Sequence, residues 1–312
     1  MARRRIGQEV FGFAGGDRGR RAGLDELAAS IDWTALERPL AGIYAASKGE
    51  KAWPPLALFK ALLLGLWHDL SDVRLAEALD DRASFRRFCG FSASEPVPER
   101  TAFVRFRAEL VGRGLDEALL RAVVRQLEAQ RLVVKTGTLI DATVIAAASK
   151  DDADAGWSAR AGRPAVKGYK AHVATDEEGG IVRRVAVTPA NLHDSRGLAP
   201  VLPARPGRVW ADAAYDQAAT REHIRAKGGT PHIPRRIYRR SRPALNAAKA
   251  AWNATIRPVR SRIEKVFGTT KRSYGLRRAR YLGLARVSLQ VHLTAIAYNL
   301  RRATALLRPQ CA

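Results

Sequence analysis

Cysteine and clustered histidine are both scarce in this 312-residue sequence. The two cysteines, Cys89 and Cys311, lie far apart, and neither has a second thiol or a histidine at metal-ligand spacing. The six histidines likewise form no pair at ligand spacing. These absences argue against a structural zinc site and for a reducing, cytoplasmic environment.

Long apolar runs are absent as well. The most apolar stretch, residues 56–67, is too short to span a bilayer and is interrupted by Lys60. Gly12, Gly15, Gly16 and Asp17 follow the N-terminal arginines where a signal peptide would need an apolar segment. We therefore expect a cytoplasmic protein that neither crosses a membrane nor is secreted.

Acidic residues are few compared with basic ones. Lys and Arg number 54 against 30 Asp and Glu, which gives a formal net charge of +24 and a pI of about 11.1. The bases are densest near the start and in the last quarter, from Pro234 onward. So large a positive charge favours association with polyanions, and it indicates a partner such as nucleic acid.

The chain divides into three parts by pattern. Residues 1–23 are rich in Arg and Gly without an apolar period, and we expect a basic, flexible segment there. Residues 24–132 carry helical patterns, among them the stripe Leu56, Phe59, Leu63 and Leu66 behind Pro54 and Pro55. A short helix over 101–110 and a longer one up to Gln130 complete a predicted all-helical domain.

Strand patterns begin near Val133. Residues 136–147, 167–176 and 180–189 predict three strands, the last two joined by a hairpin turn over 177–180. A compact strand within 208–215 ending in Asp212, a helix over 217–227 and an edge strand over 230–233 follow. A helix from Pro258 that Gly275 closes, and a last helix over 284–307, end the chain. Residues 149–165 read as a polar loop or inserted arm. The fold prediction for 133–312 is mixed α/β behind a helical domain.

Three carboxylates in this second half are candidate site residues. Asp141 interrupts an apolar strand, where an unpartnered charge would cost several kcal/mol; an exposed strand end or a pairing with arginine are the alternatives. Asp212 follows a strand at its carboxyl end, where open α/β sheets place ligand-binding groups, although it could simply cap a turn. Glu264 is the one acid among six bases in 257–272. An i,i+4 pair with Arg260, worth about 0.2–0.5 kcal/mol, is its simplest explanation.

Taken together, the three acids predict a metal site. At 100° per residue, Arg260, Glu264 and Lys271 fall along one edge of the apolar stripe of their helix. Two aspartates from adjacent strands and a glutamate from a packed helix make an oxygen-only site that suits Mg²⁺ or Mn²⁺. Two such ions could activate the attacking oxygen and stabilise the leaving one of a phosphodiester held by the bases. The element order is that of a ribonuclease-H-like domain with a mixed sheet.

Several segments carry a resemblance to a known family. They are LSDVRLAEALDDRASFRRFCGF, LIDATVIAAA, KGYKAHVATD, TPANLHDS, ADAAYD and RSRIEKVFGTTKRSYGLRRARYLGL. Over nearly its whole length the chain resembles bacterial insertion-sequence DDE transposases of the type-five (IS-five) group. The resemblance implies that Asp141, Asp212 and Glu264 are the catalytic and metal-binding triad. Arg260 and Lys271 match the signature Tyr-x2-Arg-x3-Glu-x6-Lys, whereas Arg257 replaces its tyrosine.

The resemblance also implies the partners: terminal inverted repeats, target DNA and a homo-oligomer assembled on DNA. Arg257, Arg260 and Lys271 are expected to contact phosphate. Arg105 and Arg107, on the short helix after a turn, are candidates for groove reading, or else the helical half only dimerises or braces the catalytic domain. His193 and Asp194 either support the site or form a plain turn. A catalytically inactive DNA-binding regulator of the same element is the alternative function.

Overall fold

The N-terminal part is built from seven helices within the described residues. The computed structural model describes residues 5–7, 22–44, 51–160, 162–238 and 242–308, so the predicted flexible segment 1–23 lies almost entirely outside them. The helices are α1 (Ala22–Ala29), α2 (Thr34–Leu40), α3 (Pro55–Trp67), α4 (Asp72–Asp81), α5 (Ala83–Cys89), α6 (Arg100–Gly112) and α7 (Asp116–Ala129).

Local sequence signals explain where these helices begin and end. Proline stands at the first position of α3, where the missing N–H costs nothing. Ser71 caps α4 by accepting a hydrogen bond from the Arg74 amide at 3.3 Å. Gly90 ends α5 with a φ of 89°, a conformation that favours glycine. The sequence thus predicted the helical character of this part correctly.

The second half contains one mixed sheet. Its strands are β1 (Gly137–Ala146), β2 (Gly156–Arg160), β3 (Arg163–Asp176), β4 (Val182–Pro189), β5 (Arg208–Trp210) and β6 (Thr230–His232). The central order is β4-β3-β1-β5-β6, in which β1, β3 and β4 are antiparallel while β1, β5 and β6 are parallel. This is the predicted ribonuclease-H-like arrangement. The strand predicted within 208–215 and ending in Asp212 is shorter: β5 stops at Trp210, and the chain turns into the 3-10 helix Ala213–Tyr215.

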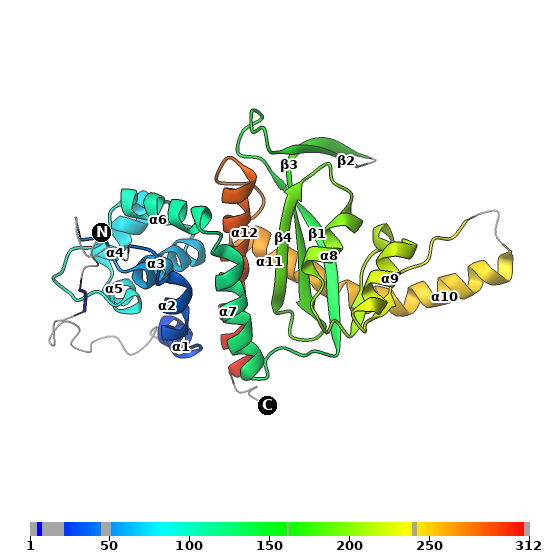
Figure 1. Ribbon diagram of the computed structural model, residues 1–312, viewed down its shortest axis with the longest axis horizontal. Coiled ribbons are helices and arrows are strands. Elements are labelled where there is room, and N and C mark those ends of the chain that lie inside the picture. Colours follow the sequence, from blue (N-terminus) through cyan, green and yellow to red (C-terminus); the bar gives the residue numbers. More distant parts are fainter. Residues whose placement is uncertain (1–4, 8–21, 45–50, 161, 239–241, 309–312) are drawn as a thin grey trace.

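The segment 149–165 differs from its prediction as a polar loop. Residues 156–160 form β2, which pairs antiparallel with the first half of β3 to make a two-stranded extension of the sheet (Figure 1). Gly168 lies at its base, where a Cβ would come within 2.0 Å of the Ile145 carbonyl oxygen. Trp157 and Val166 are exposed on this ribbon. Since it stands free of the core, its residues lack the apolar alternation by which buried strands are recognised.

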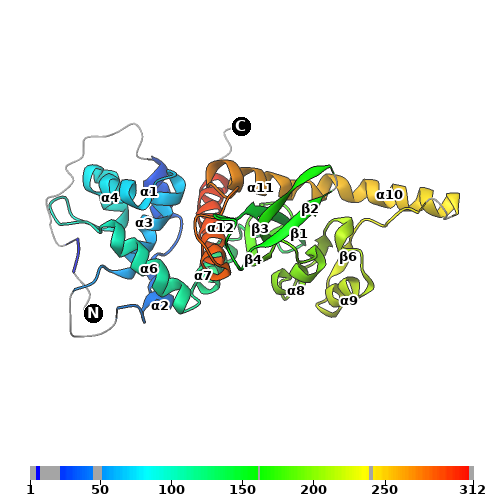
Figure 2. The same cartoon turned by 90° about the horizontal axis from the view of Figure 1, so that it is seen from above.

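Helices cover both faces of the sheet. One face packs Ile140 and Val209 against α8 (Leu198–Val201), α9 (Ala218–Ala226) and Tyr215 of the 3-10 helix. The other face packs Leu139 and Trp210 against α10 (Pro243–Arg260) and α11 (Arg262–Ser273). In Figure 2 the two sets of helices lie on opposite sides of the strands. The residues of β1 therefore alternate between two cores.

The last helix, α12 (Leu284–Leu307), joins the two halves. It packs against β4 on one side and α3, α6 and α7 on the other, and Figure 1 shows α7 and α12 together between the N-terminal helices and the sheet. Trp67 Nε1 donates to the Ala297 carbonyl at 3.0 Å, and the buried Asn299 amide bonds both backbone groups of Val182. The main core is therefore continuous across residue 132; the predicted boundary there stays a prediction.

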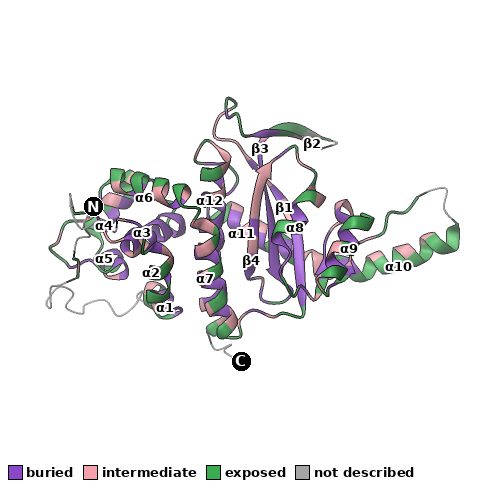
Figure 3. Cartoon of the chain, in the orientation of Figure 1, coloured by how far each residue is buried: buried purple, intermediate pink, exposed green. Residues whose placement is uncertain are grey.

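The helix that carries Glu264 begins later than predicted. A helix from Pro258 onward was expected, but α10 ends at Arg260 and α11 starts at Arg262, with Ser261 between them. Pro258 lies in the last turn of α10, where its ring removes a hydrogen-bond donor. The N-terminal part of α10 projects from the molecule and is largely exposed (Figure 3), so it has no wide apolar stripe to announce it.

None of the helices in the described parts of the chain combines the length and the apolar character that a membrane span requires.

Candidate active site

Asp141 and Asp212 follow paired positions on two neighbouring parallel strands. Leu139 of β1 and Trp210 of β5 are register partners, and each aspartate comes two residues later. Because side chains alternate along an extended strand, both aspartates point to the face that carries Leu139 and Trp210. That face is the one covered by α10 and α11. The sheet thus brings together two carboxylates that are 71 positions apart in sequence.

The Asp141 carboxylate is largely buried, with 15% of its side chain exposed. Its Oδ1 accepts the Ala142 amide at 2.7 Å and its Oδ2 lies 3.4 Å from Arg260 Nη1. Burial, together with the negative charges of Asp212 and Asp194, raises its pKa to about 6, although the Ala142 amide and Arg260 pull it down. Asp141 therefore holds its charge at a cost, as groups at functional sites often do.

Arg260 connects Asp141 to Glu264. While its Nη1 faces Asp141, its Nη2 donates to Glu264 Oε1 at 2.8 Å. The Glu264 side chain is 60% exposed, whereas that of Arg260 is 24% exposed. One guanidinium therefore stands between a strand carboxylate and a helix carboxylate, in a place that attracts a cation.

The third predicted carboxylate belongs to the same region. Asp212 Oδ1 accepts the Ala214 amide at 2.9 Å and caps the 3-10 helix Ala213–Tyr215. Its charge acts on Asp141. Each simple explanation from the sequence is thus present as a contact: the Asp141–arginine pair, the Asp212 cap and the Arg260–Glu264 pair. The sequence could not show that one arginine, Arg260, forms both ion pairs.

The donor chemistry fits a hard divalent ion, since all three groups are carboxylates. As the side chains lie, however, no group of three or more His, Cys, Asp or Glu side chains among the described residues is arranged to hold a metal. The Arg260 guanidinium contacts both Asp141 and Glu264 in this arrangement.

Asp194 is a fourth carboxylate beside the site. Its Oδ1 lies 2.6 Å from Lys170 Nζ, with both side chains mostly buried, and its charge raises the pKa of Asp141. The neighbouring His193 is exposed, and its ring bonds Ser195 within the turn. The sequence did not decide whether His193 and Asp194 support the site or form a turn. In the structure they differ: His193 stabilises the turn, and Asp194 lies near the carboxylates.

Tyr215 lies in the segment ADAAYD that carries the family resemblance, but no role was predicted for it. It is fully buried, and its hydroxyl has no hydrogen-bond partner among the described atoms. Burial and the charges of Asp141, Asp194 and Asp212 raise its pKa. Its place three residues after Asp212 was the available signal.

The basic residues expected to contact DNA have different surroundings. Arg257 is exposed on α10, and Lys271 is half-buried on α11. Arg105 is exposed on α6, but Arg107 on the same helix pairs with Asp72, with Nη1 2.9 Å from Oδ1, and its guanidinium lies over the Tyr281 ring. These contacts explain Arg107 without DNA; its role in groove reading stays a prediction.

The chain matches two protein families and is remotely similar to a solved structure. The family described as "Transposase DDE domain" matches residues 134–300, more than half of the chain. The family described as "Transposase domain (DUF772)" matches residues 18–109. Among solved structures, the chain is similar to the piggyBac transposase in its cryo-EM synaptic complex with hairpin DNA. That similarity is remote: 9% identity and a TM-score of 0.42, over 93% of this chain and 81% of the other.

Proposed function

The chain belongs to the family of DDE-domain transposases, and we propose that Asp141, Asp212 and Glu264 are its three catalytic carboxylates. As a DDE transposase it cleaves DNA strands and transfers them. The assignment of residues is supported above all by Arg260, whose guanidinium reaches both Asp141 and Glu264. Glu264 lies on a separate helix, and this shared arginine links it to Asp141.

Enzymes of this family generally use divalent metal ions. We propose two Mg²⁺ or Mn²⁺ ions here, held by Asp141, Asp212 and Glu264 with the substrate phosphate completing their coordination. Ions so bound would activate the attacking oxygen and stabilise the leaving oxygen. Asp141 must be ionised to bind a cation, so its raised pKa means that acid weakens the site.

The chain's own residues hold the DNA. DNA binding follows from the family, and Arg257, Arg260 and Lys271 lie on α10 and α11 close to Glu264 in sequence. We propose that these three contact phosphates near the scissile bond. In the present structure Arg260 is engaged by the two carboxylates, so we infer that it turns to phosphate when another cation takes its place. Arg105 is proposed to contact DNA from the helical half.

The insertion-sequence group and the oligomeric state of the protein are also proposals. The spacing of Arg260, Glu264 and Lys271 supports the type-five insertion-sequence group, despite Arg257 in the tyrosine position. Because an element has two ends to be cut and joined, we further propose that the protein acts as a homo-oligomer on DNA. Short inverted repeats flanking the gene would support the group, and the mass of the protein–DNA complex tests the oligomer.

Metal removal tests the central proposal. Cleavage of a repeat-end duplex should stop in EDTA and return with Mg²⁺ or Mn²⁺. The control is DNA binding by the same protein in EDTA, which should persist because the bases remain charged. Cleavage that continues unchanged in excess EDTA would exclude the metal site. Binding without cleavage under any metal would instead favour the alternative of an inactive regulator.

A further inference from the structure

A cavity of about 640 Å³ lies beside the edge strand β4, away from the carboxylates. Its walls are α7, β4, the segment before β5 and the start of α12, and none of the three proposed catalytic residues lines it. In the sheet, β4 is separated from β1 by β3, and β5 lies on the far side of β1. The volume is within the range of about 300–1,000 Å³ that ligand sites usually have.

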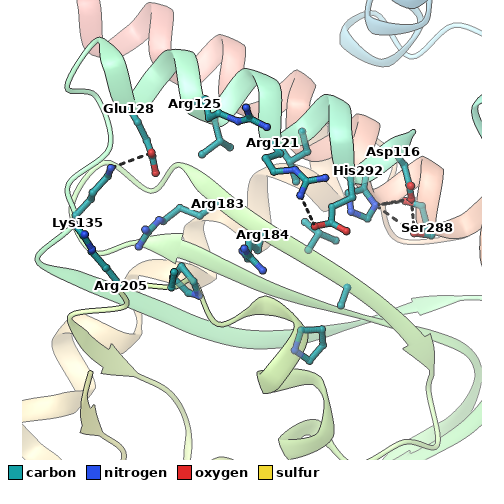
Figure 4. Close-up of a pocket in the computed structure, with 18 residues that line it drawn as sticks. Asp116, Arg121, Arg125, Glu128, Lys135, Arg183, Arg184, Arg205, Ser288 and His292 are labelled. Atoms are coloured by element: carbon teal, nitrogen blue, oxygen red, sulfur yellow. Dashed lines mark hydrogen bonds and ion pairs between the residues drawn. The ribbon is translucent and has the colours of Figure 1, made fainter. Parts of the chain in front are cut away.

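Basic side chains from four segments converge on this cavity. They are Arg121 and Arg125 of α7, Lys135, Arg183 and Arg184 of β4, and Arg205. Figure 4 shows them on both sides of the cavity, α7 on one side and β4 with the segment before β5 on the other. Bases gathered from separate parts of the chain are not a solvated helix face.

The acids of the cavity already have partners. Glu128 lies 3.0 Å from Lys135 Nζ, and Glu117 lies 3.9 Å from Arg121. Asp116 accepts from Ser288 Oγ at 2.8 Å and lies 3.1 Å from His292 Nδ1. By contrast, within the described residues Arg125, Arg184 and Arg205 have no carboxylate within 4.0 Å. The cavity therefore presents an excess of positive charge.

Arg183 is the strongest indication of an absent partner. Four cationic side chains are buried among the described residues: Arg86, Lys170, Arg221 and Arg183. The first three each have a carboxylate at 2.6–2.7 Å. Within the described residues, Arg183, only 8% exposed, has a single hydrogen bond, to Thr138 Oγ1 at 3.1 Å, and no carboxylate within ion-pair distance.

An unpaired buried charge is costly. Glu128 and Asp176 are near enough to raise the pKa of Arg183, but burial has the larger effect and lowers it. Asp176 is itself committed to the amides of Gly179 and Ile181. An anion bound in the cavity would provide the missing counter-charge.

We propose that this cavity binds phosphate groups of the backbone of a DNA segment other than the one held at the carboxylates. Guanidinium groups match phosphate oxygens in two-point contacts, and the chain is a DNA-binding protein with a net charge of +24. This inference depends on the proposed position of the catalytic site, because the second segment is defined by its distance from it.

The test uses the full chain with Arg125, Arg184 and Arg205 all changed to Gln. We measure binding to a non-specific duplex across a salt series. Losing three phosphate contacts should reduce the slope of log K against log salt by about 2.7, since each contact contributes about 0.9. The matched control changes three other arginines, Arg74, Arg225 and Arg286, to Gln, and all three are exposed. An unchanged slope in the cavity variant, or an equal fall in the control, would overturn the proposal.

A second variant tests Arg183 itself. Arg183→Met removes the buried charge and keeps much of the side-chain volume. In DNA-free buffer its Tm should equal or exceed that of the unchanged protein, while the rise in Tm on adding duplex should shrink. A marked loss of Tm with an undiminished response to DNA would mean that Arg183 is purely structural, and would contradict the proposal.

Two further measurements identify the source of the phosphate and distinguish failure of the cavity proposal from failure of the proposed function. A Tm rise that millimolar ATP or an acidic peptide produces through Arg183, and duplex DNA does not, would refute the assignment to DNA backbone. Cleavage of a pre-bound repeat-end substrate should be unaffected by the triple cavity variant. If cleavage is lost in EDTA as expected but the slope does not change, only the cavity proposal fails.

Discussion

Changing Asp141 to Asn should make the protein more stable at neutral pH in the absence of divalent ions. The Asp141 carboxylate is 15% exposed, and burial is the largest cause that raises its pKa to about 6. Asparagine has nearly the same shape but carries no charge. The substitution therefore removes the cost of ionising a buried acid while the strand remains packed.

The magnitude follows from the pKa. An unfolded aspartate titrates near 3.8, so the folded protein holds its proton up to a pH about two units higher. At about 1.4 kcal/mol for each unit, the charged carboxylate destabilises the fold by roughly 3 kcal/mol above pH 6. Below about pH 3, under both pKa values, the acid is largely protonated in both states, and this cost disappears. Stability from this group is thus present at low pH and is lost as the pH rises from about 4 to 6.

The assay is urea unfolding of both proteins in EDTA between pH 4 and pH 8. The free energy of unfolding of Asp141→Asn should match that of the unchanged protein near pH 4 and exceed it by up to about 3 kcal/mol at pH 8. Comparing the two proteins at each pH cancels the titration of other groups that the substitution does not affect. A destabilised variant, or a difference that does not depend on pH, would refute the reasoning, since Arg260 would then compensate the charge fully.

Adding Mg²⁺ reverses the comparison. Ions that bind only the folded state stabilise it by mass action, so the unchanged protein should gain stability while Asp141→Asn gains little. If both proteins respond alike to Mg²⁺, Asp141 is not a ligand. The variant thus distinguishes the destabilisation that the buried charge causes from its contribution to Mg²⁺ binding.

Three other predictions concern named side chains. Glu264→Gln should leave the free energy of unfolding within about 0.5 kcal/mol, because the Glu264 side chain is 60% exposed. The variant should retain or tighten DNA binding while repeat-end cleavage falls by several orders of magnitude; near-normal cleavage would mean that Glu264 forms only a surface ion pair. Lys271→Ala should weaken binding to the cleavage-site duplex and lower the salt slope by about 0.9, and no change in either would remove it from the phosphate contacts. Arg107→Ala should lower the free energy of unfolding by about 1–3 kcal/mol, because it leaves Asp72 of a partly buried pair without its partner. Arg105→Ala on the same helix should instead weaken DNA binding without changing the free energy of unfolding. The reverse pattern would mean that the two roles are assigned wrongly.

Much of this architecture was predictable from the sequence for reasons that are local. The helical stripe behind Pro54 and Pro55, the Ser71 cap and the hairpin before β4 each depend on residues close together along the chain. Asp141 was recognisable because a charge within an apolar strand needs a compensating group. Those patterns, ordered along the chain, also carried the family resemblance that the match to residues 134–300 supports.

Other features needed the tertiary structure. The ribbon of β2 and the projecting part of α10 lie outside the cores, so no apolar period marked them. The break at Ser261 divides Arg260 from Glu264, yet with both helices packed on Leu139 and Trp210 the Arg260 guanidinium contacts both Asp141 and Glu264.

The sequence by itself determined which residues carry the charge: many bases, few acids, and three carboxylates in patterns that resemble those of DDE transposases. Which charges are compensated was decided only by the fold, because compensation depends on distance and burial. Arg107, predicted to contact DNA, is paired with Asp72, whereas Arg183, which no pattern distinguished, is buried without a carboxylate partner in the part of the chain that the structure describes. The sequence specifies the type of each side chain, but the oppositely charged partner comes from segments that are distant in sequence and become neighbours only in the folded protein.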